Sequence, residues 1–176
     1  MKPVTAIVFG TTWLDLFGLG IRYAQRKKTP FHVGIKFDME DGAQVGFEGS
    51  YGKNGWIQFR YLDKIASYHG DITKTVREIV LNLSSEQIEE LYIAAKEMTK
   101  SVERYTSKST MVWKLLHERR GWPMWRTKNI VDCSEGLARL LFSIGIDLRD
   151  KENPIFDAMS PSEVWEAIKK WQAASA

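Results

Sequence analysis

The single cysteine of the chain, Cys133, lies where its sulfur could act as a nucleophile. Asp132 before it can cap a helix, and Glu135 can reach back to the cap amide, so Cys133 would be the first helical residue. Helix starts favour the thiolate and lower a cysteine pKa from about 8.5 to between about 3.5 and 7.5. The alternative is an inert cysteine that serves as a small buried apolar side chain. The sequence therefore leaves two interpretations of Cys133, a nucleophile and an inert buried side chain.

Of the three histidines, His32 is the one whose surroundings need an explanation. It lies within an apolar run, where an unpaired imidazole would be costly to bury. His69 and His117 both have polar neighbours that need no special account. A thiolate that transfers acyl groups also requires a base, so we predict that His32 fills this role.

Glu48 is the candidate third member of the site. It closes the apolar run 45–47, and the Asp41-Gly42 turn predicts that its strand pairs with the strand of His32. A carboxylate there could hold the imidazole in its productive tautomer. Alternatively, Glu48 only marks the end of a strand.

The elements that would position these residues are strands in the first half and helices later. The strands are predicted at 3–10, 31–37, 43–48, 56–62 and 77–83. The helices are predicted at 12–28, from the capping sequence at 84, from 132 to a stop at 145, and from the capped proline start at 160. This arrangement predicts an α+β fold.

The composition predicts one soluble globular domain. The chain has 176 residues, of which 44% are hydrophobic, a size and content typical of a single packed domain. One cysteine excludes an internal disulfide and a zinc site built on cysteine pairs. No apolar run reaches the roughly 18 to 20 residues of a membrane span, and no signal peptide is evident. We expect a cytoplasmic protein, with a phage or secreted effector as the alternative.

A basic segment at 100–128 carries the positive excess of the chain. It holds eight basic and two acidic residues and three interleaved tryptophans, Trp113, Trp122 and Trp125. This surface could bind phosphates, anionic lipid or nucleic acid. The alternative is a solvated face with inward tryptophans. The basic residues for which we consider an anionic partner are Arg119, Arg120, Arg126 and Lys128.

Three segments in this order resemble a known superfamily. They are 29–35 (TPFHVGI), the strand that ends in Glu48, and 132–137 (DCSEGL). Together they resemble the circularly permuted branch of the NlpC-type papain-fold superfamily, with its YiiX-like hydrolases and lecithin:retinol acyltransferase relatives. In that branch the histidine precedes the cysteine. The segment 159–163 (MSPSE) resembles the closing Ser-Pro segment of these proteins, whereas Phe31 stands where a small polar residue is more usual.

The resemblance implies a role for each candidate residue. Cys133 would be the nucleophile, His32 the base and Glu48 the polar third residue. Tyr105 is the nearest match to a tyrosine that helps to form the oxyanion hole, although Thr106 replaces the acidic residue expected after it. No metal or organic cofactor is required by this chemistry.

The resemblance also implies a fold and a reaction. The fold would be a single permuted papain-like domain over 1–176, with a barrel-like antiparallel sheet packed against helices. The reaction would be hydrolysis or acyl transfer at an amide, ester or thioester bond of a peptide-like or lipid substrate. The rival interpretation is a catalytically silent papain-like module that binds nucleic acid, anionic lipid or a protein partner through the basic, tryptophan-rich segment.

Overall fold

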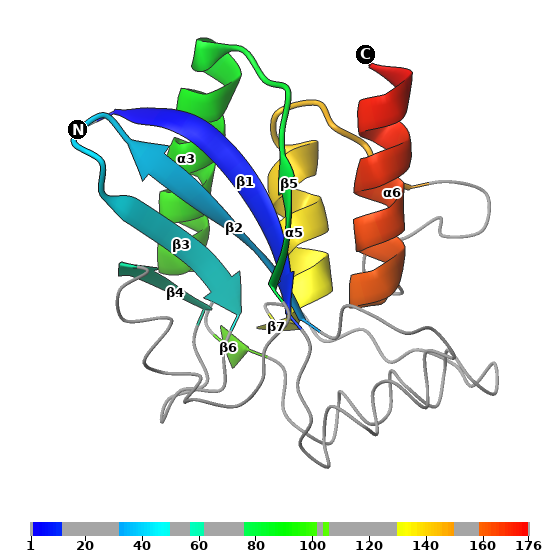
Figure 1. Cartoon of the computed structure of the whole chain (residues 1–176). Helices are drawn as coiled ribbons and strands as arrows, with labels where there is room; N and C mark the ends of the chain where they lie inside the picture. The colour runs from blue at the N-terminus through cyan, green and yellow to red at the C-terminus, as the bar shows by residue number, and fades with distance from the viewer. Residues whose placement is uncertain are drawn as a thin grey trace, which may run out of the picture.

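The computed structural model describes residues 2–11, 32–49, 57–61, 76–101, 104–105, 130–149 and 159–175. Across these ranges the strands dominate the first half of the chain and the helices the second half. Figure 1 shows the large sheet in front and the helices behind it. The expected α+β class is confirmed.

The large sheet is antiparallel throughout its described strands. Its strands are β1 (Pro3–Thr11), β2 (His32–Met39), β3 (Gln44–Gly49), β4 (Ile57–Tyr61) and β5 (Val76–Val80). They lie in the order β4-β3-β2-β1-β5. A second, small sheet pairs β6 (Arg104–Tyr105) with β7 (Ile130–Val131) in parallel. All five strands predicted for the first half of the chain are therefore found, with ends shifted by at most a few residues.

The hairpin of β2 and β3 turns at Asp41 and Gly42, as the sequence predicts. The amide of Met39 donates to the carbonyl of Ala43 over 2.9 Å, and the Asp41 carboxylate accepts from the Ala43 amide over 3.2 Å. Gly42 has a φ of 80°, a conformation that glycine adopts without steric cost. The turn fixes the register of the two strands, which their apolar alternation also specifies.

Three described helices pack beside the sheet, namely α3 (Ser85–Ser101), α5 (Cys133–Phe142) and α6 (Pro161–Ala174). Two of them begin with reciprocal capping boxes. Ser84 and Gln87 exchange side-chain to backbone hydrogen bonds before α3, and Ser160 and Glu163 do the same at α6. The capping sequences predicted at 84 and 160 are confirmed.

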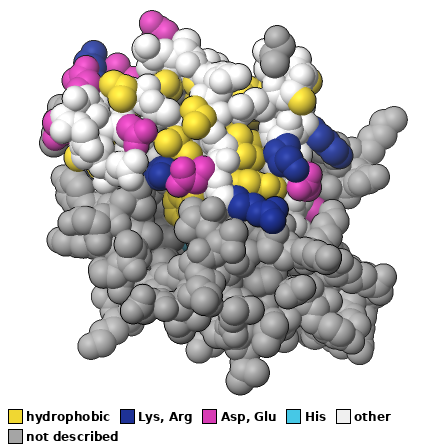
Figure 2. All heavy atoms as spheres, in the orientation of Figure 1, with side chains coloured by type: hydrophobic (Ala, Val, Ile, Leu, Met, Phe, Trp, Pro, Cys, Tyr) yellow, Lys and Arg dark blue, Asp and Glu magenta, His cyan; other side chains and the backbone are white. Residues whose placement is uncertain are grey.

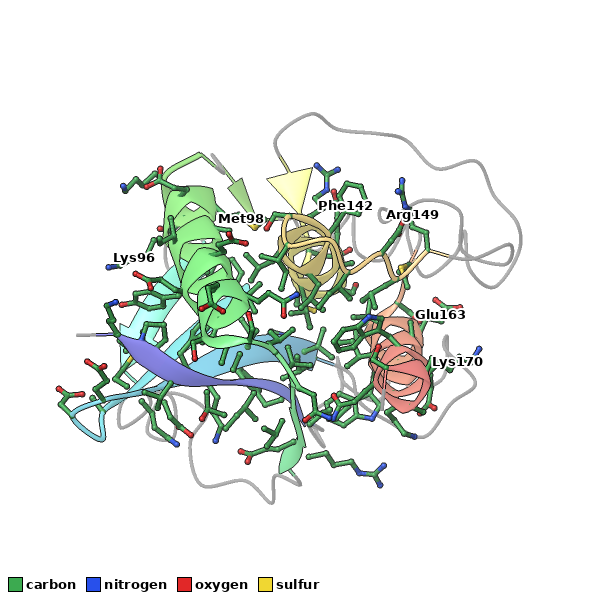
Figure 3. All side chains as sticks on the ribbon, turned by 90° about the horizontal axis from the view of Figure 1, so that it is seen from above. Lys96, Met98, Phe142, Arg149, Glu163 and Lys170 are labelled. Atoms are coloured by element: carbon green, nitrogen blue, oxygen red, sulfur yellow. The ribbon has the colours of Figure 1, made fainter. Side chains whose placement is uncertain are left out.

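One face of the sheet packs against the helices and forms the core. Seen from above, α3 and α5 lie over this face while α6 stands beside it (Figure 3). Val33, Ile35 and Phe37 of β2 are completely buried there. Each such aliphatic or aromatic side chain contributes about 1.5–3 kcal/mol on burial. The other fully buried side chains of this core include Val8, Leu91, Leu137, Leu140, Leu141, Val164 and Ile168.

The expected barrel-like closure of the sheet is wrong for the described strands. In the order given above, β4 and β5 are the two edges, with three strands between them. A barrel requires hydrogen bonds between its first and last strands. The described sheet is open, and its apolar face is covered by helices instead of by its own curvature.

Several predictions fall outside the described ranges. These are the helix at 12–28 and most of the basic segment 100–128, including Arg119, Arg120, Arg126 and Lys128. None of the helices in the part of the chain that the structure describes combines the length and apolar character needed to cross a bilayer.

Candidate functional site

Cys133 is the first residue of α5, as its sequence context predicts. The Asp132 side chain caps the helix, and its Oδ1 accepts from the amides of Ser134 and Glu135 over 2.9 Å each. The Ser134 hydroxyl donates to the same oxygen over 2.6 Å. These bonds occupy two of the orphan amides of the first turn. The amide of Cys133 is not one of the two that Asp132 binds.

The thiol of Cys133 is buried, with 8% of the residue exposed. Two buried acidic residues are near it in the sequence. Asp132 is engaged in capping, and Glu135 pairs with Arg139 one turn along the helix.

His32 is the first residue of β2 and is buried, with 4% of its surface exposed. It stands opposite Thr11 in the pairing of β1 with β2. Its imidazole packs near the ring of Phe9, with the ring centroids 6.5 Å apart and the planes tilted by 56°. This separation lies within the range of favourable aromatic contacts.

The structure brings α5 and β2 together but separates the faces on which their candidate residues lie. The two elements pack against each other, and their first residues lie at the same end of the molecule (Figure 1). Cys133 belongs to the core on the helix side. Strand alternation puts His32 on the opposite face, together with Gly34 and Lys36. A contact between thiol and imidazole therefore has to pass round the start of β2.

Glu48 lies on the same face as His32. It faces Gly34 in the pairing of β2 with β3, so it is a diagonal neighbour of His32, two residues away along β2. It is the penultimate residue of β3, which is also what the strand-end alternative expects. The structure describes its backbone position alone.

The backbone of Tyr105 lies close in space to the start of α5. In the small parallel sheet it pairs with Val131, two residues before Cys133. Two segments far apart in sequence therefore meet just before the candidate nucleophile. Its side chain is outside what the structure describes.

Sequence reasoning missed Phe9 and Gly34 as neighbours of His32. A Cβ atom built on Gly34 would lie 2.5 Å from Cζ of Phe9, so the phenyl ring occupies the space above the glycine. Phe9 sits in a run of apolar residues, and nothing local distinguishes it. The glycine two residues after His32 was the available signal, because a glycine inside a strand often marks a close approach.

Other comparisons leave the site to be interpreted from its own geometry. Within the described ranges, no three side chains among His, Cys, Asp and Glu come together as a metal site. No known protein family matches the chain, and no curated protein matches its sequence.

Proposed function

We propose that the chain is a cysteine-dependent hydrolase or acyltransferase with a permuted papain-like fold. Its substrate would contain an amide, ester or thioester bond. Cys133 would be the nucleophile, His32 the base and Glu48 the residue that orients the base. The order of histidine before cysteine, which the permuted branch of the superfamily shares, supports this assignment.

The observation that carries the proposal is the meeting of α5 and β2 at their starts. Cys133 and His32 are more than a hundred positions apart in the sequence, yet each is the first residue of its element and the two elements pack together. The proposal requires the imidazole of His32 to reach past the start of β2 toward the start of the helix.

In the proposed mechanism His32 has a second role besides that of base. The proposal places an imidazolium beside the thiol, and a neighbouring imidazolium favours a thiolate. In this proposal the thiolate exists because His32 holds the proton, so the two residues act as one ion pair.

The proposed reaction proceeds through an acyl-enzyme. The Cys133 thiolate attacks the carbonyl carbon, and the resulting oxyanion is stabilised by the Cys133 amide, with Tyr105 as a further candidate donor. The bond to the leaving group then breaks, and the leaving group takes the proton from His32. Water or another acceptor gives its proton to His32, attacks the thioester and releases the thiolate.

Acyl transfer to Cys133 can be measured by intact-mass spectrometry with p-nitrophenyl esters and acyl thioesters as donors. The wild-type protein should gain one acyl group, and Cys133→Ala should gain none. His32→Ala should lose nearly all of the activity, and Glu48→Gln a part of it, because the base remains but its orientation is lost.

Ser143→Ala is a matched control, since this serine caps the other end of the same helix. It should acylate like the wild type. An adduct that forms equally in Cys133→Ala would contradict the proposal, as would a wild-type protein that accepts no acyl group from any donor.

A further inference from the structure

Gly34 leaves a space on the sheet that the ring of Phe9 fills. The two residues face each other across β1 and β2. A Cβ atom on Gly34 would lie 2.5 Å from Cζ and 2.9 Å from Cε1 of Phe9, and 2.9 Å from the carbonyl oxygen of Phe47. Real Cβ atoms essentially never come within 3.0 Å of such neighbours. Glycine at this position therefore leaves the room that the phenyl ring occupies.

The ring held in this way is the one that contacts His32. Because Thr11 faces His32 and Phe9 faces Gly34, Phe9 and His32 are diagonal neighbours on the same face. The centroids of the imidazole and the phenyl ring are 6.5 Å apart, and both residues are 4% exposed. The final torsion of a histidine side chain has a broad energy profile, so neighbouring groups decide how the imidazole is turned.

We propose that Phe9 is a positioning residue for the imidazole of His32, and that Gly34 admits its ring. The phenyl ring limits rotation of the imidazole about its Cβ–Cγ bond and so favours one orientation. In a fixed orientation each ring nitrogen keeps the same surroundings, and those surroundings set the tautomer. The consequence for the thiol rests on the proposed function, because it assumes that His32 is the partner of Cys133. The effect on the imidazole itself does not depend on that function.

The competing interpretation is that Phe9 only fills space. The two interpretations differ in a double variant, because leucine lacks the Cζ and Cε1 atoms that an added methyl group would meet. Gly34→Ala alone should lower the melting temperature through this clash. Adding Phe9→Leu should recover the part of that loss that the phenyl ring causes, whereas the close contact with the carbonyl oxygen of Phe47 remains. It removes the aromatic contact with His32 at the same time.

The test is ¹⁵N NMR of the His32 imidazole in the full chain, with His32→Asn used to assign its signals among the three histidines. Imidazole ¹⁵N shifts report the tautomer and the protonation state. At alkaline pH, where the imidazole carries a single proton, the wild type should show one dominant tautomer. Phe9→Leu and the Phe9→Leu/Gly34→Ala double variant should both show a mixture, although the double variant regains part of the stability that Gly34→Ala loses. Alkylation of Cys133 at mildly acidic pH should fall about tenfold in both, at the lower end of what loss of an orienting partner costs.

Tyr92→Leu is the matched control. It removes the edge contact between Tyr92 and Phe37, whose ring centroids are 5.2 Å apart, on the helix side of the sheet. The His32 signals should stay at their wild-type positions in this variant. If the double variant recovers both stability and the wild-type tautomer, or if Phe9→Leu leaves the tautomer unchanged, Phe9 is not a positioning residue. In that case His32→Ala can still abolish thiol reactivity, so the proposed function is judged separately.

Discussion

The two faces of the large sheet are built for different purposes, although they share every strand. On the face toward the helices the residues of β2 are all apolar, and Val33, Ile35 and Phe37 are wholly buried there. The opposite face carries the buried Phe9 as well as charged side chains such as Lys36. Figure 2 shows apolar and charged side chains next to each other on this face. The centre of the core therefore lies on one face and the candidate base His32 on the other, while Cys133 belongs to the helix side.

Strand β2 shows this division most clearly, because its residues alternate between the two faces. Next to the buried Phe37, Lys36 points to the opposite face and pairs with Glu78 of β5 over 2.6 Å, reaching across β1. His32 and Gly34 share that face with Lys36. One strand therefore supplies both the centre of the core and the candidate base.

The largest effect is expected on the helix side, from Phe37→Ala. Phe37 is fully buried and packs edge-on against Tyr92, so its truncation removes apolar contacts and leaves a cavity. The free energy of unfolding, measured with urea, should fall by about 3–5 kcal/mol. A loss below about 1 kcal/mol would mean that the core does not depend on this face.

An intermediate effect is expected where the helix layer meets the end of the sheet, from Asp132→Ala. Loss of the cap should lower the free energy of unfolding by about 0.5–2 kcal/mol. Ser160→Ala at the start of α6 is the matched control and should cost a similar amount. Only Asp132→Ala should alter the alkylation rate of Cys133. Equal rates in both variants would show that the cap has no effect on the reactivity of the thiol.

The smallest effect is expected on the opposite face, from Lys36→Met. Methionine keeps most of the aliphatic stem, and the Glu78 side chain that loses its partner is 45% exposed and can be hydrated. The free energy of unfolding should change by less than about 1 kcal/mol, and less still at high salt. A loss as large as that of Phe37→Ala would abolish the contrast between the faces.

Much of this arrangement could be predicted from local sequence. Turn residues, capping residues and alternating apolar positions act over a few residues. For this reason the sequence correctly predicts the Asp41-Gly42 hairpin and the cap at Asp132. Strand alternation also predicts the face on which His32 lies. His32 is two residues from Gly34 and four from Lys36, so it shares their face and not that of Val33.

The remaining features depend on partners that are distant in the sequence. Whether the sheet closes depends on its two edge strands, β4 and β5, and no local pattern determines that pairing. The contact of Phe9 with His32 exists only in the register of β1 with β2. The same holds for Tyr105, which reaches Val131 through the small sheet.

The central claim, that His32 activates Cys133 from across the end of β2, is tested most directly by the rate of Cys133 alkylation with iodoacetamide as a function of pH. The wild-type rate should reach its plateau from mildly acidic pH upward, and His32→Ala should move the rise to higher pH because the imidazolium that stabilises the thiolate is gone. A wild-type midpoint at about 8.5, which is the pKa of an ordinary thiol, would contradict the claim if His32→Ala left that midpoint unchanged.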